Sequence, residues 1–259
     1  MRHSFDEIMK RTRKAITSHH MIEDEQPIMV GLSGGKDSAT LLYALKEFLP
    51  ASKYKYKLAA GHISLGFPTD DITPLEDYCR SLDVPFYYEK TQIGSVIFDI
   101  RKESNPCSLC AKMRRGALNN LAKNNGFAKV ALAHHQDDVL ETLFLKTFFE
   151  GNLGTFNPVT YLDRIGITVI RPLIYVPESV IAYFVRKQEI PVVESCCPAN
   201  NHTKRTEMKA IINQITAISP AARDRAVSAI EHLFVSRWDG IEIKQVYQTY
   251  LDFIKEKKM

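Results

Sequence analysis

Short apolar runs alternate with helical patterns along the chain from Pro27 onward. Apolar runs of four to eight residues predict buried strands, and apolar positions spaced three or four apart predict helices. The expected strands are Ile28–Leu32, Leu58–Leu65, Pro85–Tyr88, Lys129–Ala133 and Ile167–Ile170. The intervening helices are expected at Asp37–Phe48, Asp71–Leu82, Leu109–Lys123 and Gln136–Phe149. Because helices of this length separate the strands, we expect a five-stranded parallel sheet with helices on both faces.

Both ends of the chain show helical patterns without strands. The first segment is amphipathic and should pack outside the sheet, with an apolar face made by Phe5, Ile8, Met9, Thr12 and Ile16. After Pro177 helices are expected at Glu178–Gln188, Lys204–Ile218, Ala221–Arg237 and Ile241–Lys257. The expected organisation is an N-terminal helix in residues 1–26, a Rossmann-like α/β domain in residues 27–200, and a helical extension in residues 201–259 packed on that domain. The helix from Val139 to Phe149 is apolar on nearly every side and should be buried.

Composition favours an ordinary globular protein of the cytoplasm. The 259 residues are 45% apolar, which supports a substantial core. No apolar stretch approaches the roughly 20 residues that cross a bilayer, and the first residues lack the pattern of a signal peptide. Thiols stay reduced in the cytoplasm, so the five cysteines are expected to be ligands or reactive groups rather than disulfides.

The net charge of +4 says little about partners, but its distribution says more. Basic residues gather at Lys10–Lys14, at Lys112–Arg115, and at Lys204 and Arg205 followed by Lys209. These clusters can neutralise nucleic-acid phosphates if the fold brings them together, and each can equally be a solvated helix face. A homodimer is compatible with the sequence, although no heptad or exposed strand pattern demonstrates one.

The segment Ser33-Gly34-Gly35-Lys36-Asp37-Ser38, called the glycine turn below, follows an expected strand and opens an expected helix. Backbone N–H groups of the two glycines and of the first helical residues converge there, which favours an anion. The serine hydroxyls can add donors, and Lys36 adds positive charge. The Walker pattern and G-x-G-x-x-G are both absent. A plain glycine turn with a capping residue is the alternative, but the flanking strand and helix make a phosphate site the better interpretation.

A polar cluster, His134-His135-Gln136-Asp137-Asp138, follows the strand that begins at Lys129. Ligands of parallel sheets bind outside the carboxyl ends of the strands, so this cluster and the glycine turn should face the same crevice. Adjacent carboxylates near a triphosphate suit magnesium, although one of them can instead cap the following helix. The histidines are candidates for proton transfer or for structural hydrogen bonding.

Cys107 and Cys110 are spaced C-x-x-C and precede a helix that carries Arg114 and Arg115. Such a pair can be a redox pair, half of a zinc site, or part of an iron–sulfur cluster. Two more cysteines, Cys196 and Cys197, are adjacent, whereas Cys79 lies in an apolar helical pattern and is expected in the core. Three thiolates around a cubane cluster would leave one iron without a protein ligand. The residues alone do not choose between zinc and iron.

Several of these motifs resemble a known family. SGGKDS resembles the PP-loop of the N-type ATP pyrophosphatases, which hold ATP while a substrate oxygen is adenylated, usually with magnesium. The chain resembles the tRNA 2-thiocytidine synthetases over roughly Phe5 to Ile212, through the ordered motifs SGGKDS, NPCSLCAKMRRGAL, KVALAHHQDDVLETLF, VIRPLIY and CCPANNHTKR. The further C-x-x-C pairs of related 2-thiouridine synthetases and the acidic C-terminal tail of some 2-thiocytidine enzymes are absent.

The resemblance implies an ATP-dependent tRNA sulfurtransferase acting on a cytidine of the anticodon loop, with position 32 expected. Its C2 oxygen would be adenylated and then replaced by sulfur through a [4Fe-4S] cluster that has one iron not bound by protein. The ligands implied are Cys107, Cys110 and Cys197; alignment on Thr203-Lys204-Arg205 favours Cys197 over Cys196. tRNA and a sulfur donor, either derived from a cysteine desulfurase or sulfide itself, are the expected partners.

The resemblance also implies roles for individual residues. The expected phosphate-binding residues are Ser33, Gly34, Gly35, Lys36 and Ser38, and the expected adenine contacts are Ser64 and Leu65. The expected catalytic residues are Asp37, Asp137, Asp138, His135 and Arg114. Asp37, Asp138 or both would bind magnesium, Arg114 would face the cluster, and Lys112 or Arg115 would contact tRNA phosphate.

Two alternatives stay open. One is a same-fold enzyme that forms 2-thiouridine or another modified tRNA nucleoside. The other is a non-catalytic, metal-containing RNA-binding sensor that uses the nucleotide only as a signal.

Overall fold

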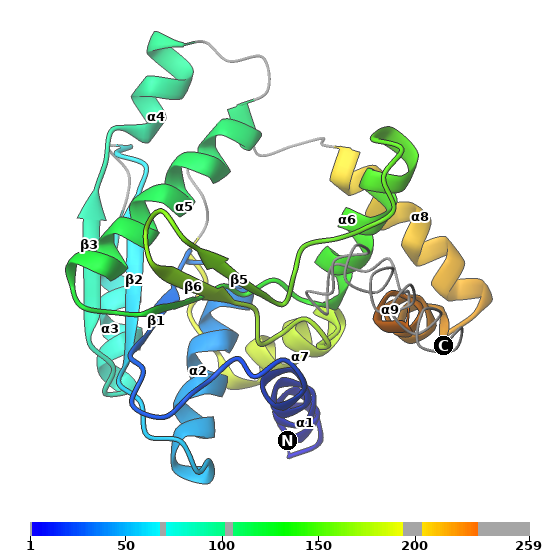
Figure 1. The fold of residues 1–259 in the computed structure, drawn as a ribbon, viewed down its shortest axis with the longest axis horizontal. Helices are drawn as coiled ribbons and strands as arrows, with labels where there is room; N and C mark the ends of the chain where they lie inside the picture. Colours follow the sequence, from blue (N-terminus) through cyan, green and yellow to red (C-terminus); the bar gives the residue numbers. More distant parts are fainter. Residues whose placement is uncertain (1, 68–70, 102–105, 194–203, 233–259) are drawn as a thin grey trace, which may run out of the picture. The chain divides into compact units, whose positions relative to one another are not determined.

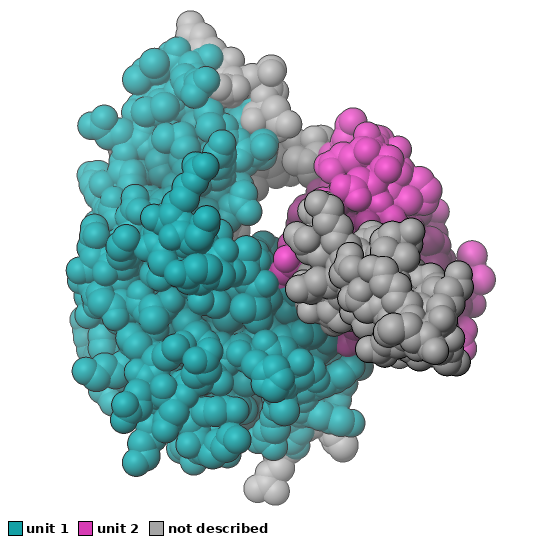
Figure 2. Space-filling model, in the orientation of Figure 1, with its two compact units in different colours: residues 1–135, 158–201 teal, residues 136–157, 202–259 magenta. Residues whose placement is uncertain are grey.

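The computed structural model describes residues 2–67, 71–101, 106–193 and 204–232. The chain divides into two compact units, which Figure 2 shows in different colours. Unit 1 comprises residues 1–135 and 158–201, and unit 2 comprises residues 136–157 and 202–259. The expected boundaries after residues 26 and 200 stay a prediction. Among the described helices none has the length and apolar character needed to cross a membrane.

Unit 1 is built on a six-stranded sheet, within the described residues, with the order β3-β2-β1-β4-β6-β5. Its strands are β1 (Ile28–Gly31), β2 (Leu58–Ser64), β3 (Phe86–Lys90), β4 (Lys129–Ala131), β5 (Val159–Leu162) and β6 (Ile167–Ile170). Pairing is parallel from β3 through β6, and only β5 runs antiparallel, against β6. The fold class and the five expected strands are therefore confirmed.

The expected count of five strands is too low by one, because β5 was not predicted. This strand lies at the edge of the sheet, and none of its four residues is fully buried. Its position depends on antiparallel pairing with β6 through a turn that contains Gly166 at a φ of 75°. An edge strand without a buried face leaves little hydrophobic signal in the sequence.

Helices cover the sheet of unit 1 on both faces (Figure 1). Helix α5 packs over β2, β3 and β4, and α2 packs against β1 and β2. The helices of unit 1 are α1 (Arg2–Ser18), α2 (Lys36–Ala51), α3 (Thr73–Ser81), α4 (Ile93–Ser95), the π-helix η1 (Val96–Ile100), α5 (Pro106–Asn124) and α7 (Glu178–Gln188). Helix α1 packs against α2 and α7 rather than on the sheet, as expected. Ile8, Thr12 and Ile16 of its predicted apolar face are buried.

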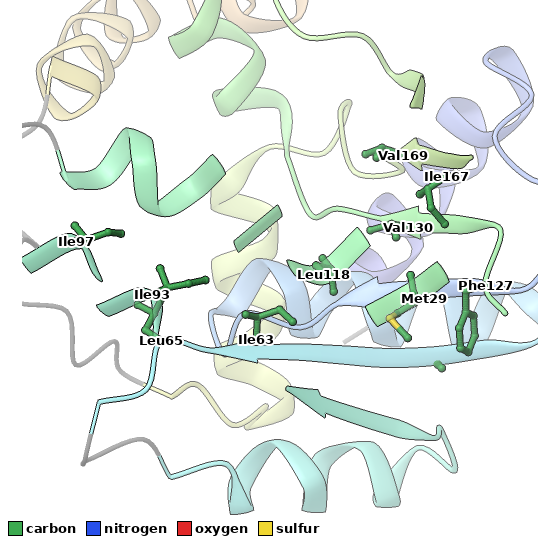
Figure 3. Packing of buried hydrophobic residues seen from close by; sticks show 12 residues of the cluster. Met29, Ile63, Leu65, Ile93, Ile97, Leu118, Phe127, Val130, Ile167 and Val169 are labelled. Carbon is green, nitrogen blue, oxygen red and sulfur yellow. The ribbon is translucent and has the colours of Figure 1, made fainter. Parts of the chain in front are cut away.

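The core beneath α5 is continuous across the sheet (Figure 3). Met29 of β1, Val130 of β4 and Val169 of β6 pack with Leu118 of α5. Full burial of one such side chain stabilises a fold by about 1.5–3 kcal/mol. Cys79 is only 1% exposed, so its predicted place in the core is confirmed. This core fixes the strands whose carboxyl ends carry the polar motifs.

Unit 2 contains α6 (Gln136–Phe149), α8 (Lys204–Ile218) and α9 (Ala222–His232). Helix α6 packs against both α8 and α9. The expectation that α6 is buried from Val139 to Phe149 is wrong for its last turn, where Phe148 is 67% and Phe149 49% exposed. Apolar residues around a whole helix predict burial only when neighbours surround it, and here the buried residues lie in the first half. The expected helix at residues 241–257 lies outside the described residues.

Gly66 provides a test of the junction that follows β2. Its φ is 85°, and a Cβ added to it would lie 2.2 Å from the carbonyl oxygen of Thr91. We expect Gly66→Ala to destabilise the protein by about 3 kcal/mol or more, because left-handed strain of about 1–2 kcal/mol adds to a backbone clash. Chemical denaturation measures this loss. Gly126→Ala is the matched control, because its φ is 76° and a Cβ there meets nothing within 4 Å. Equal losses in both variants would contradict the clash.

Candidate functional site

The glycine turn connects β1 to α2 in unit 1, at the carboxyl edge of the parallel strands. Gly34 has a φ of 92°, and Gly35 occupies the N-cap position of α2. Because the N-cap residue is glycine, no side chain of its own covers the N-terminus of the helix. The turn is closed by serines: the Oγ of Ser38 accepts hydrogen bonds from the backbone N and the Oγ of Ser33, both at 3.1 Å. This geometry fits a cradle for an anion.

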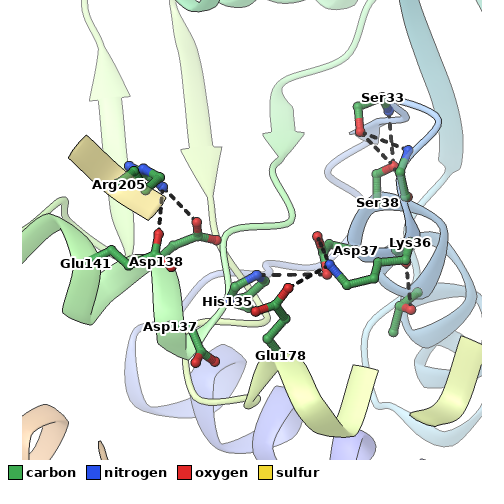
Figure 4. A network of polar contacts seen from close by, with 12 residues as sticks. Ser33, Lys36, Asp37, Ser38, His135, Asp137, Asp138, Glu141, Glu178 and Arg205 are labelled. Carbon is green, nitrogen blue, oxygen red and sulfur yellow. Dashed lines mark hydrogen bonds and ion pairs between the residues drawn. The ribbon is translucent and has the colours of Figure 1, made fainter. Parts of the chain in front are cut away.

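Lys36, at the first position of α2, is held between two carboxylates (Figure 4). Its Nζ lies 3.2 Å from Oδ2 of Asp37 and 3.0 Å from Oε1 of Glu178, the first residue of α7. Burial lowers the pKa of Lys36, but the charges and hydrogen bonds of the two carboxylates outweigh it, so the pKa is raised above its usual value. Lys36 is therefore a fixed positive charge beside the turn.

The second carboxylate oxygen of Asp37 has a different environment. Oδ1 is buried and makes no hydrogen bond within the described residues. Nε2 of His135 lies 3.9 Å from it. A buried carboxylate oxygen without a hydrogen bond is costly unless a ligand satisfies it. This oxygen therefore fits a role as ligand to a hard divalent cation such as magnesium.

The predicted adenine contacts lie at the end of β2, the neighbour of β1. Ser64 and Leu65 are both buried. The backbone oxygen of Ser64 accepts a 2.6 Å hydrogen bond from Oγ1 of Thr91, and the Oγ of Ser64 accepts a 2.9 Å bond from the N–H of Gly66. Parallel pairing of β1 with β2 brings this strand end to the same edge of the sheet as the glycine turn.

The acidic residues of α6 are paired with arginines inside unit 2, and Figure 4 shows the pairs of Arg205. Nη1 of Arg205 lies 2.8 Å from Oδ1 of Asp138 and 3.5 Å from Oε2 of Glu141. Asp137 forms an ion pair with Arg223 of α9. Burial lowers the pKa of Arg223. Two of the predicted catalytic carboxylates thus carry arginine counter-ions from α8 and α9.

The thiols of Cys107 and Cys110 lie near the start of α5, at its second and fifth residues. Residues three apart lie on the same face of a helix, so the pair can converge on one ligand. Cys107 is exposed and Cys110 is half-buried, and Arg114, also half-buried, follows one turn later. Cys196 and Cys197 lie outside the described residues. In the part of the chain that the structure describes, no three metal-binding side chains come together. Two accessible thiols one turn apart fit part of an iron–sulfur site.

The chain that precedes the adjacent cysteines is bonded to the glycine turn. The backbone N–H of Val193 donates a 2.9 Å hydrogen bond to the carbonyl oxygen of Gly34. Sequence reasoning missed both this contact and Glu178. The signal for Glu178 was weak: an acidic residue directly after Pro177, at the expected start of a helix. That signal indicates a helix N-terminus and names no partner.

Comparisons with known proteins agree with this geometry. The PP-loop domain family matches residues 5–215. The tRNA-cytidine(32) 2-sulfurtransferase of Citrifermentans bemidjiense is 35% identical over 233 residues, which are 89% of this chain and 91% of that protein. The enzyme of the same name from Pelobacter propionicus is 37% identical over 223 residues, which are 85% of this chain and 83% of that protein.

One solved structure supports the fold. It is the U34-tRNA thiolase NcsA from Methanococcus maripaludis with its [4Fe-4S] cluster. The two structures match with a TM-score of 0.72 over 88% of this chain and 78% of that chain. Sequence identity is 23%, so this likeness concerns the fold alone.

Proposed function

Because the chain belongs to the PP-loop family and, within it, to the tRNA-cytidine(32) 2-sulfurtransferases, we propose that it uses ATP to replace the C2 oxygen of a tRNA cytidine by sulfur. The observation that carries this proposal is the glycine turn, an uncapped helix N-terminus with Lys36 and Asp37 beside it. Such a site holds a polyphosphate and places a carboxylate next to it.

The first step would be adenylation of the cytidine. The C2 oxygen attacks the α-phosphorus of ATP, a new oxygen–phosphorus bond forms, and pyrophosphate leaves with the electrons of the broken bond. Gly34, Gly35, Ser33 and Ser38 would bind the phosphates, and Ser64 and Leu65 would contact the adenine. Positioning and charge stabilisation supply most of the catalysis in such transfers.

Magnesium is part of the proposal because of the local charge. One ammonium lies between two carboxylates at the glycine turn, so the described groups around Lys36 carry a net negative charge. A polyphosphate would be repelled there unless a divalent cation accompanied it. Asp37 is the better candidate ligand because its Oδ1 is buried without a hydrogen bond among the described residues, whereas Asp138 is paired with Arg205.

The second step would be replacement of the adenylated oxygen. A sulfur nucleophile forms a bond to C2, and AMP leaves with the former C2 oxygen. A bound [4Fe-4S] cluster with one iron free of protein ligands would carry the incoming sulfur atom. Cys107, Cys110 and Cys197 would hold the cluster, with Cys196 as the rival third ligand, and Arg114 would stabilise charge beside it.

Chain length supports a third ligand close to the nucleotide. Cys197 follows Val193 by four residues, and four residues of extended chain span at most about 14 Å. Val193 is itself bonded to Gly34. Chain length is therefore compatible with Cys197 as the proposed third ligand.

The partners would be tRNA and a sulfur donor. Lys112 and Arg115 are exposed on α5 and can contact tRNA phosphates. The target cytidine must leave the base stack before its C2 oxygen can reach ATP. A cysteine-desulfurase-derived or inorganic sulfide donor, a homodimer and a cytoplasmic location stay predictions.

The proposal is tested on the tRNA itself. Nucleosides from cells that lack this chain, and from the same cells after it is restored, are analysed by mass spectrometry. We expect 2-thiocytidine to disappear and return. Anaerobically purified protein should contain iron and acid-labile sulfide in equal amounts. Loss of a 2-thiouridine instead would establish the same-fold alternative, and unchanged tRNA with nucleotide binding alone would favour the sensor.

A further inference from the structure

Glu178 is an acidic residue beside the nucleotide site that the reaction described above does not use. It belongs to α7, 142 positions after Lys36 in the sequence, yet its Oε1 lies 3.0 Å from the Lys36 Nζ. Its side chain is 20% exposed, less than those of Lys36 at 31% and Asp37 at 28%. The ion pair is thus partly shielded from water, and it joins α7 to the first residue of α2.

Packing determines where α7 presents this carboxylate. Phe184 of α7 is buried, and its ring lies 5.5 Å from those of both Tyr43 of α2 and Phe5 of α1. After the end of α7, Val193 donates its hydrogen bond to Gly34. The glycine turn is therefore contacted by the first residue of α7 and by the segment that follows this helix. Rigid elements position a functional side chain better than loops do.

We propose that Glu178 is a positioning residue of the nucleotide site and acts through Lys36; this role rests on the proposed use of ATP. Lys36 is directly followed by Asp37, and an ammonium on a flexible stem would settle on that carboxylate if it had no other partner. Glu178 forms an ion pair with the same ammonium and keeps it beside the glycine turn. Asp37 is then only partly neutralised by Lys36 and can still bind a cation. The ammonium of Lys36 stays extended toward incoming phosphate.

A simpler role for Glu178 is favourable interaction with the N-terminus of α7, where acidic residues stabilise the helix dipole. That role would operate without Lys36. A double-mutant cycle separates the two roles, because residues that act through each other give non-additive effects. The variants are Glu178→Gln, Lys36→Met and their combination. Glu189→Gln is the matched control, since it removes the same charge from an exposed position at the other end of the same helix.

Binding of a non-hydrolysable ATP analogue with magnesium is measured by calorimetry, and KM and kcat for ATP are measured in AMP formation with tRNA. We expect Glu178→Gln to weaken binding and raise KM about fivefold, the upper end for a partly exposed ion pair, with kcat changed less than about twofold. It should add nothing in the Lys36→Met background, and Glu189→Gln should resemble the unsubstituted chain. Equal weakening in both backgrounds, or unchanged or tighter binding in Glu178→Gln, would overturn the proposal.

A second measurement needs no ATP. Thermal unfolding is compared for the same variants without nucleotide. The stability losses of Glu178→Gln and Lys36→Met should be less than additive in the combined variant, because each removes the same ion pair. Additive losses would show that the pair is absent in solution. If the unsubstituted chain binds no ATP, the proposed function fails, and this result is distinct from a failure of Glu178 to act through Lys36.

Discussion

Cys107→Ser and Cys110→Ser should each abolish tRNA thiolation while leaving ATP binding nearly unchanged. Both thiols lie near the start of α5, outside the glycine turn. Loss of one thiolate from the proposed three-cysteine cluster site should exceed the roughly 10- to 100-fold losses seen when groups behind a metal ligand are removed. We expect no detectable 2-thiocytidine, loss of iron and of the visible absorbance of the cluster, and normal calorimetric binding of the ATP analogue.

Cys79→Ser is the control for this experiment. Cys79 is 1% exposed, and burial, with a smaller contribution from Glu76, raises the pKa of its thiol to about 12. A protonated core thiol is a poor ligand and a poor nucleophile. The variant should keep its iron and its thiolation activity and lose only stability. Retention of iron and activity in Cys107→Ser, or loss of both in Cys79→Ser, would refute the assignment of the ligands.

Features that depend on neighbouring residues were predicted correctly from the sequence. Features that depend on residues far apart in the chain were missed. Helix α6 begins and ends where its pattern predicts, at Gln136 and Phe149, because local periodicity and turn residues define those limits. The parallel strands were also predicted, since each contains or begins with a short run of apolar or aromatic residues. Strand β5 was missed because its structure comes from pairing with β6 rather than from its own hydrophobicity.

Contacts of the predicted site residues in each unit show the same division. The glycine turn is a local feature, and its strand–turn–helix geometry could be predicted from adjacent residues. The partner of Lys36 is 142 residues away, and Arg205 and Arg223 are distant in sequence from Asp138 and Asp137. Spacing carries no information about such pairs, because the tertiary packing of α7, α8 and α9 creates them. The sequence therefore left the carboxylate for magnesium undecided between Asp37 and Asp138.

Asp37→Asn is expected to reduce adenylation far more than Asp138→Asn. This comparison decides which of the two carboxylates binds magnesium. Asparagine keeps the shape of the side chain but supplies no negative charge for a cation. The Oδ1 of Asp37 is buried with no hydrogen bond in the described residues, so it fits the proposed role as ligand to a cation. We expect kcat for AMP formation to fall by about 100-fold or more, as when a single charge-stabilising group is removed from an active site.

The magnesium dependence of analogue binding provides the second measurement for this pair. Asp37→Asn should require more magnesium for half-saturation, whereas Asp138→Asn should bind normally, because Arg205 already balances the charge of Asp138. Thermal unfolding checks that both variants fold. The ion pair of Asp138 involves an arginine whose side chain is 46% exposed, so its loss should change stability by no more than about 1 kcal/mol. A larger kinetic defect in Asp138→Asn than in Asp37→Asn would assign the cation to α6. Arg205 would then have to leave Asp138 before ATP could react.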